Sequence, residues 1–147
     1  DAGTFFPTYN VVSAWPLDVD KTDVCDATIH VPTVMVVRGL AALTGIRPDE
    51  GLVMGMVMDD ATWSPLAGAR VVRDGSGSPL SVAYPTPDFT GLETSSVTST
   101  SGMWIVSGVL AGLTNVVAEL GGYRFEVQPV ASPPGHCLFV SFPGQAL

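Results

Sequence analysis

Basic residues are scarce in this sequence. Lysine and arginine together number 6 against 14 aspartate and glutamate residues, which gives a formal net charge of −8 at pH 7. Lys21 is the only lysine, and the arginines are scattered along the chain rather than clustered. A surface of this charge repels the phosphate backbone of nucleic acids and anionic lipid headgroups. We therefore expect neither a nucleic-acid partner nor a basic membrane-binding face.

The sequence also lacks a hydrophobic run long enough to cross a membrane. Its most apolar stretch covers residues 33–46 and is interrupted by Arg38, whereas a spanning helix needs about 20 apolar residues. The 16 glycines and 12 prolines leave little room for a long helix, because both residues disfavour helix interiors. We expect one helical turn near residues 40–43 and no membrane insertion.

Side chains that commonly carry catalysis are few. The chain has two histidines, His30 and His136, and no Gly-x-Ser-x-Gly motif that would present a serine nucleophile. The stretch GSGSP at residues 75–79 has the composition of a loop. Without a base beside a nucleophile, little is available to move a proton near neutral pH. The sequence predicts a domain that is not an enzyme.

What the sequence does contain is a series of short strand-like runs. Val, Met, Ile, Thr and aromatic residues are separated by clusters of Gly, Pro, Ser and Asp, which is typical of strands joined by turns. In residues 51–59 the two alternating sets are both apolar, so both faces of that strand are expected to be covered. The predicted strands are 9–15, 27–37, 51–59, 69–74, 95–100, 102–109, 114–120, 123–130 and 136–142, with a short one at 80–84 inside the loop 74–96.

The length and the spacing of these runs indicate the fold class. A chain of 147 residues suits a single domain. Strands at this spacing, without helical crossovers between them, favour antiparallel pairing over a parallel α/β sheet. We therefore predict an all-β protein, an antiparallel two-sheet β-sandwich.

Turn residues beside the strands follow a recognisable order. The phrases MGMVMD at residues 54–59 and PLAGARV at residues 65–71, followed by a Gly-x-Trp strand, resemble the carboxypeptidase regulatory-like domain, a transthyretin-like β-sandwich. The resemblance implies a Greek-key core over residues 50–147 and an N-terminal extension over residues 1–49 packed on it. It also implies an accessory role, because the matching residues serve turns and close strand contacts. They are Gly55, Val57, Asp59, Pro65, Leu66, Gly68, Ala69, Val71, Gly102, Trp104, Leu110, Gly112, Gly122 and Tyr123.

An acidic segment near the N-terminus is a candidate metal site. The stretch LDVDKTDVCD at residues 17–26 contains Asp18, Asp20 and Asp23, and its first two acids share the i, i+2 spacing of calcium loops. It lacks the glycine and the glutamate that complete such a loop. Two interpretations stay open, a calcium site and a solvated acidic loop. We expect no other cofactor.

Two cysteines lie far apart, near the two ends of the chain. Cys25 and Cys137 would close a loop of about 110 residues if they formed a disulfide. An even count of cysteines in an acidic, lysine-poor β protein favours an oxidising compartment. We predict a Cys25–Cys137 disulfide and a secreted, periplasmic or cell-surface location, with two buried free thiols as the alternative.

Two classes of function fit these observations. The first is a non-catalytic accessory module, a spacer, adhesion or protein-interaction domain that meets a protein partner at the cell surface. The second is a carbohydrate-binding module whose loop aromatics, Trp63, Tyr84 and Phe89, stack on the faces of sugars. A shared exposed patch of Trp63 and Tyr84 would favour the glycan partner, and burial of both rings at the end of the sandwich would oppose it. The oligomeric state is left open.

Overall fold

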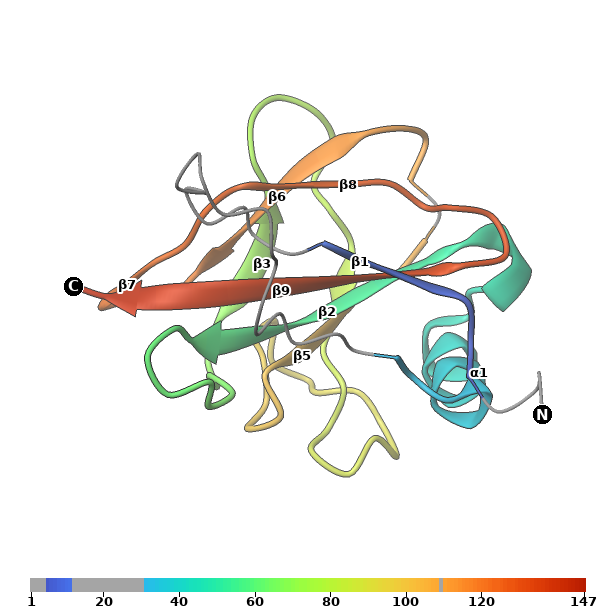
Figure 1. The fold of residues 1–147 in the computed structure, drawn as a ribbon, viewed down its shortest axis with the longest axis horizontal. Coiled ribbons are helices and arrows are strands. Elements are labelled where there is room, and N and C mark those ends of the chain that lie inside the picture. The colour runs from blue at the N-terminus through green and yellow to red at the C-terminus, as the bar shows by residue number, and fades with distance from the viewer. Residues whose placement is uncertain (1–4, 12–30, 109) are drawn as a thin grey trace, which may run out of the picture.

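The computed structural model of the chain describes residues 5–11, 31–108 and 110–147. Its elements are β1 (Thr8–Val11), α1 (Val34–Thr44), the 3-10 helix η1 (Pro48–Glu50), β2 (Leu52–Asp59), β3 (Arg70–Arg73), β4 (Val82–Ala83), β5 (Met103–Val106), β6 (Thr114–Glu119), β7 (Tyr123–Arg124), β8 (Gln128–Val130) and β9 (Cys137–Ala146). The larger of two sheets has the order β1-β9-β2-β5-β4, with β7 also paired to β9, and the smaller has the order β3-β6-β8 (Figure 1). The predicted two-sheet β-sandwich is confirmed.

Most strand pairs are antiparallel, but β9 pairs in parallel with both β1 and β2. This differs from the fully antiparallel sandwich that the strand spacing predicts. Parallel neighbours need a long crossover connection, and the segment that contains α1 connects β1 to β2 on either side of β9. This crossover is not predicted from the sequence, because residues 27–37, which include the first turn of α1, are assigned there to a strand.

The predicted strand over residues 27–37 is wrong where the structure describes it, because α1 begins at Val34. The Thr33 hydroxyl accepts a hydrogen bond from Val36 N–H at 3.3 Å and caps the helix. Val37, Leu40 and Ala41 are buried at helical spacing. The run of β-branched residues indicated a strand, and burial of one helical face overrides that preference. Residues 27–30 lie outside the described residues.

The other predicted strands compare well with the structure. Those at 51–59, 69–74, 80–84, 102–109, 114–120 and 136–142 correspond to β2, β3, β4, β5, β6 and β9, and β1 covers the described part of 9–15. The run 123–130 divides into β7 and β8. The predicted strand at 95–100 is wrong: Thr98 instead exchanges backbone hydrogen bonds with Gly68 and Ala69, at 2.8 Å each, and holds the start of β3.

Two hydrophobic cores lie on the two faces of β2. Val53 and Val57 face the core between the sheets, and Leu52 and Met54 face a second core that includes Val37 and Leu40 of α1. Each fully buried side chain of this size contributes about 1.5–3 kcal/mol. The prediction that both faces of this strand are covered is confirmed.

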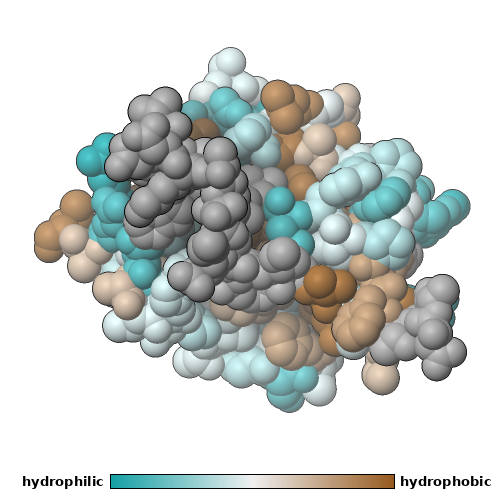
Figure 2. All heavy atoms as spheres, viewed as in Figure 1, coloured by the Kyte–Doolittle hydropathy of each residue, from teal (hydrophilic) through white to brown (hydrophobic). Residues whose placement is uncertain are grey.

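Exposed hydrophobic side chains gather near α1. Phe5, Val31, Met35 and Val36 are between 41% and 81% exposed, and Figure 2 shows hydrophobic atoms over this part of the molecule, at lower right. Neither of the helices in the described part of the chain has the length and hydrophobicity to cross a membrane.

Candidate functional site

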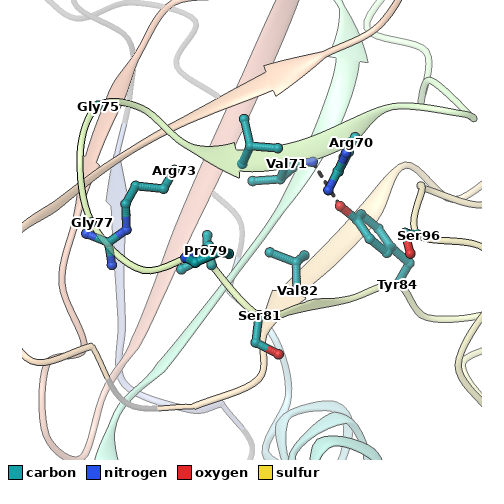
Figure 3. Close-up of a pocket in the computed structure, with 12 residues that line it drawn as sticks. Arg70, Val71, Arg73, Gly75, Gly77, Pro79, Ser81, Val82, Tyr84 and Ser96 are labelled. Carbon is teal, nitrogen blue, oxygen red and sulfur yellow. Dashed lines mark hydrogen bonds between the residues drawn. The ribbon is translucent and has the colours of Figure 1, made fainter.

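A groove runs between β3 and β4, which are edge strands of the two sheets (Figure 3). β3 pairs with β6 and ends the smaller sheet, while β4 pairs with β5 and ends the larger one. The loop that joins the two strands closes one end of the groove, whose volume is about 400 Å³. Its lining residues are Arg70, Val71, Val72, Arg73, Gly75, Gly77, Pro79, Leu80, Ser81, Val82, Tyr84 and Ser96.

Backbone polar groups of both strands point into this groove. Val71 N–H points away from β6 and donates to the Tyr84 hydroxyl at 2.9 Å, whereas Asp74 N–H points back and donates to Asn115 at 2.9 Å. Because antiparallel strands alternate in this way, the N–H and C=O of Arg73 also point to the groove. On β4, the carbonyl of Ser81 accepts from Ser107 across the ladder, so the same alternation turns the polar groups of Val82 outward. The groove therefore lies between two open sheet edges.

The charge of the groove is opposite to that of the whole chain. Its lining includes Arg70 and Arg73 and no carboxylate, although the chain carries a net charge of −8. Arg70 lies opposite Glu119 in the β3–β6 ladder, but Arg73 lies opposite Val116. Among the described residues, the ion pairs are those of Arg47 with its neighbours in and beside η1. Both arginines therefore supply positive charge to the groove, and Arg73 is the one without a charged neighbour across the ladder.

Arg73 is half-buried against the loop that follows β3. Its Nη1 atom lies 3.2 Å from the position that a Cβ atom on Gly77 would occupy, so the missing side chain there makes room for the guanidinium. The Nε atom of Arg73 is buried and has no hydrogen-bond partner. Buried polar groups are nearly always paired in folded proteins. This donor is therefore the feature of the groove that most clearly calls for an acceptor.

Tyr84 is a core residue and not a surface ring. Its side chain is 3% exposed and packs in the core between the sheets. Burial raises the pKa of its hydroxyl, and the hydrogen bond from Val71 N–H acts in the opposite direction. The structure removes Tyr84 from the predicted sugar-stacking set, because a buried ring has no free face to stack on.

Trp63 and Phe89 do lie on the surface, in loops at one end of the larger sheet. They are 49% and 42% exposed, and each has a φ of 58°, a left-handed conformation that is costly for a bulky residue. β2 and β4 are both antiparallel to β5, which lies between them, so the loops after these two strands leave the sheet at the same end. Two strained, exposed rings therefore share one end of the molecule, two strands apart.

Aspartates hold both of these loops. The Asp59 carboxylate accepts hydrogen bonds from the backbone of Ala61 and Thr62 at 3.0 and 2.8 Å and from the Tyr123 hydroxyl at 3.1 Å. The bonds from Thr62 are the largest cause that lowers the pKa of Asp59. In the other loop, Asp88 accepts a hydrogen bond from the Thr86 hydroxyl at 2.6 Å, and this bond is the largest cause that lowers the pKa of Asp88. These bonds tie together the loops that carry Trp63 and Phe89.

The remaining predicted site residues divide between described and undescribed parts of the chain. Asp18, Asp20, Asp23 and Cys25 lie outside the described residues, so the calcium site and the disulfide stay predictions. Cys137 is fully buried and forms no disulfide within the part of the chain that the structure describes, and burial raises the pKa of its thiol to about 12. Within residues 5–11, 31–108 and 110–147, no three metal-ligating side chains cluster.

Sequence reasoning missed the two arginines of the groove. The short strand RVVR is bounded by arginines and followed by the glycine-rich DGSGS, which is a signal of a charged edge strand beside an open loop. Which sheet edge faces β3 depends on how the two sheets pack, and no local pattern encodes that.

No family model matches the chain, and no curated protein matches its sequence, so the resemblance to the carboxypeptidase regulatory-like domain stays a prediction. The shaft pilin SpaA of Lactobacillus rhamnosus GG is 11% identical over 66% of this chain and 46% of the pilin, with a TM-score of 0.41. The group B streptococcus pilus 2b backbone protein is 17% identical over 65% of this chain and 41% of that protein, with a TM-score of 0.45. A chain of a type II cohesin-X-dockerin complex from Acetivibrio cellulolyticus is 19% identical over 65% of this chain and 56% of that one, with a TM-score of 0.37. The chain spans about half the length of each of these proteins. Its function therefore has to be inferred from its own residues.

Proposed function

We propose that this domain is a non-catalytic interaction module that binds a partner protein in the groove between β3 and β4. The observation that carries the proposal is the pair of open sheet edges that meet in the groove beside the unpartnered, buried Nε atom of Arg73. Open edges are templates for an extended segment of another chain. The groove also has apolar walls at Pro79, Leu80 and Val82, which can bury side chains of such a segment.

The size of the groove fits this role. A volume of about 400 Å³ lies within the range of sites that bury small ligands or a few side chains, roughly 300–1,000 Å³. A groove of this volume suits a module that recognises a short segment of a partner protein. The acidic, lysine-poor composition and the two cysteines support placing the module in a secreted or cell-surface protein, where it acts as an adhesion or interaction domain.

A groove-blocking variant tests the proposal. The Val82 side chain is half-buried in the lining and points toward Val71 on the opposite wall (Figure 3), so Val82→Trp should fill the groove. We expect a displayed library of random twelve-residue peptides to yield binders of the native domain that lose binding to a folded Val82→Trp variant. The matched control is Ala42→Trp, which places the same ring on the exposed side of α1. Binders that are insensitive to Val82→Trp, or the absence of binders, would contradict the proposal.

A second candidate function is glycan binding at the end of the sheet that carries Trp63 and Phe89. It is supported by the exposure of both rings and by the strained backbone that presents them. Calorimetric titration with soluble polysaccharides should then show saturable binding that Trp63→Ala abolishes. The control is Tyr9→Ala, which removes an exposed ring that stacks on His136 instead. If Trp63→Ala and Tyr9→Ala bind the polysaccharide equally well, or if the native domain does not bind it, glycan binding at this end of the sheet is wrong.

A further inference from the structure

We infer that the segment bound in the groove is an extended acidic chain of the partner, which adds as a strand to the free edge of β3 and places a carboxylate on Arg73. This inference rests on the proposed function and names the chemistry of its ligand. Its two parts, strand addition and carboxylate recognition, come from separate observations.

Strand addition follows from the backbone groups that β3 leaves open. Tyr84 already satisfies Val71 N–H at 2.9 Å, so an incoming strand cannot use that donor. The groups that remain are the Val71 carbonyl and the N–H and C=O of Arg73, which the alternation of the ladder turns toward the groove. The incoming segment therefore pairs with the second half of β3, beside the loop that carries Gly75 and Gly77.

Carboxylate recognition follows from the surroundings of Arg73. Its guanidinium lies against Gly77, its Nε donor is buried without a partner, and Val116 is its neighbour across the ladder. Glu119 faces Arg70 instead, and the Asp74 side chain is exposed beside the groove without lining it. A carboxylate matches the planar fork of an arginine and forms short, charge-assisted hydrogen bonds with it. No carboxylate of the lining competes for that place.

The charge of the rest of the chain makes this choice of ligand specific. A net charge of −8 repels an acidic segment from most of the surface. A groove with two arginines and no acid is where such a segment can bind. Binding that depends on these charges should weaken as salt screens them.

The probes are two synthetic ten-residue peptides with blocked ends, one alternating valine with glutamate and one alternating valine with glutamine. Both favour extended structure, and they differ only in charge. Each is titrated into the isotope-labelled chain at low salt, and binding is followed through the backbone amide signals in two-dimensional NMR. We expect the glutamate peptide to shift the signals of residues 71–82 and to bind about tenfold tighter or more than the glutamine peptide, the range of a hydrogen bond to a charged group.

Variants of the chain then assign the preference to Arg73. Arg73→Gln should abolish the preference for glutamate, and Arg73→Lys, which keeps the charge but loses the Nε donor, should retain part of it. Arg38→Gln is the matched control, because it removes the same charge from the exposed side of α1. Dispersed amide signals of each variant establish that it is folded.

The outcomes separate the inference from the proposed function. If both peptides bind the groove equally and Arg73→Gln changes neither affinity, the acidic ligand is wrong and the groove remains a binding site. If neither peptide binds while the library yields binders sensitive to Val82→Trp, the inference alone fails. If no peptide of any kind depends on the groove, both fail.

Discussion

β2 and β3 follow one another in the chain and are both rich in valine or methionine, yet they occupy opposite positions in the sandwich. β2 has a hydrogen-bonded neighbour on each side, β9 and β5, and its two faces are covered by two cores. β3 has β6 on one side and the groove on the other. The first strand carries no charged residue before Asp59, whereas the second begins and ends with arginine.

The difference shows where this molecule is stable and where it can bind. A strand paired on both sides has no backbone group left for a partner, so its residues contribute stability alone. An edge strand keeps such groups, and its charged ends both discourage unspecific pairing and select what binds. Substitutions in or beside β2 should therefore change stability most, and those in β3 should change binding.

The largest expected effect concerns the predicted Cys25–Cys137 disulfide, because Cys137 begins β9, the parallel neighbour of β2. A bridge that closes a loop of about 110 residues contributes roughly 4–5 kcal/mol in the chain-entropy model. Reduction should then lower the free energy of unfolding by that amount, measured in urea, and the unfolded, unreduced chain should contain no reactive thiol.

Two reactive thiols in the unfolded, unreduced chain would contradict the disulfide. In that case Cys137, which is fully buried with a pKa of about 12, should react with a thiol reagent at pH 8 only after unfolding. The variant Cys25→Ser serves as the control, since it removes the bridge and leaves the buried thiol in place.

Gly55→Ala tests the close packing of β2. A Cβ atom at this position would collide with the Val140 carbonyl oxygen and with the Trp104 ring, and the backbone of β9 cannot move aside without loss of its pairing. We expect a loss of roughly 3 kcal/mol or more in unfolding free energy, measured by urea denaturation. Gly121→Ala is the control, because a Cβ atom there meets nothing within 4 Å. Equal stability of the two variants would show that β2 is less tightly packed than the structure indicates.

Tyr84→Phe tests the side of β3 that faces the groove. The substitution leaves Val71 N–H buried without its acceptor, which costs about 1–3 kcal/mol. The incoming strand pairs with the Val71 carbonyl and with Arg73 rather than with this donor, so peptide binding should not weaken. Tyr9→Phe, at an exposed ring, should leave stability within about 0.5 kcal/mol. A stable Tyr84→Phe variant would contradict the role of this hydroxyl as a cap on the edge.

The smallest effect is expected at Asp59, where β2 ends. Hydrogen bonds from Thr62, and a weaker contribution from Tyr123, lower the pKa of this carboxyl below its ordinary value near 3.9. A lowered folded-state pKa contributes stability that is present above the unfolded value and lost as the pH falls through the folded value. The native chain should therefore lose stability below about pH 4 more steeply than Asp59→Asn, measured by thermal unfolding from pH 6 to pH 2. Parallel pH profiles of the two chains would count against this role.

The sequence by itself determined most of the strands and the turns between them. Runs such as residues 51–59 and 69–74 alternate with glycine and proline, and these patterns act over a few residues, so they predict β2 and β3 without knowledge of the fold. The apolar alternation of 51–59 also predicted that both faces of β2 are covered. The exposure of Trp63 and Phe89 followed from their place in loops.

The tertiary structure alone decided what depends on contacts between distant segments. Burial of Val37 and Leu40 made a helix of a β-branched run, and insertion of β9 between β1 and β2 made parallel pairs in a chain of antiparallel strands. Packing of the two sheets buried Tyr84, which composition had placed on the surface, and brought the edges of β3 and β4 together around Arg73. Local sequence carries no record of which distant strand will lie beside it, because that choice depends on the free energy of the whole packed core.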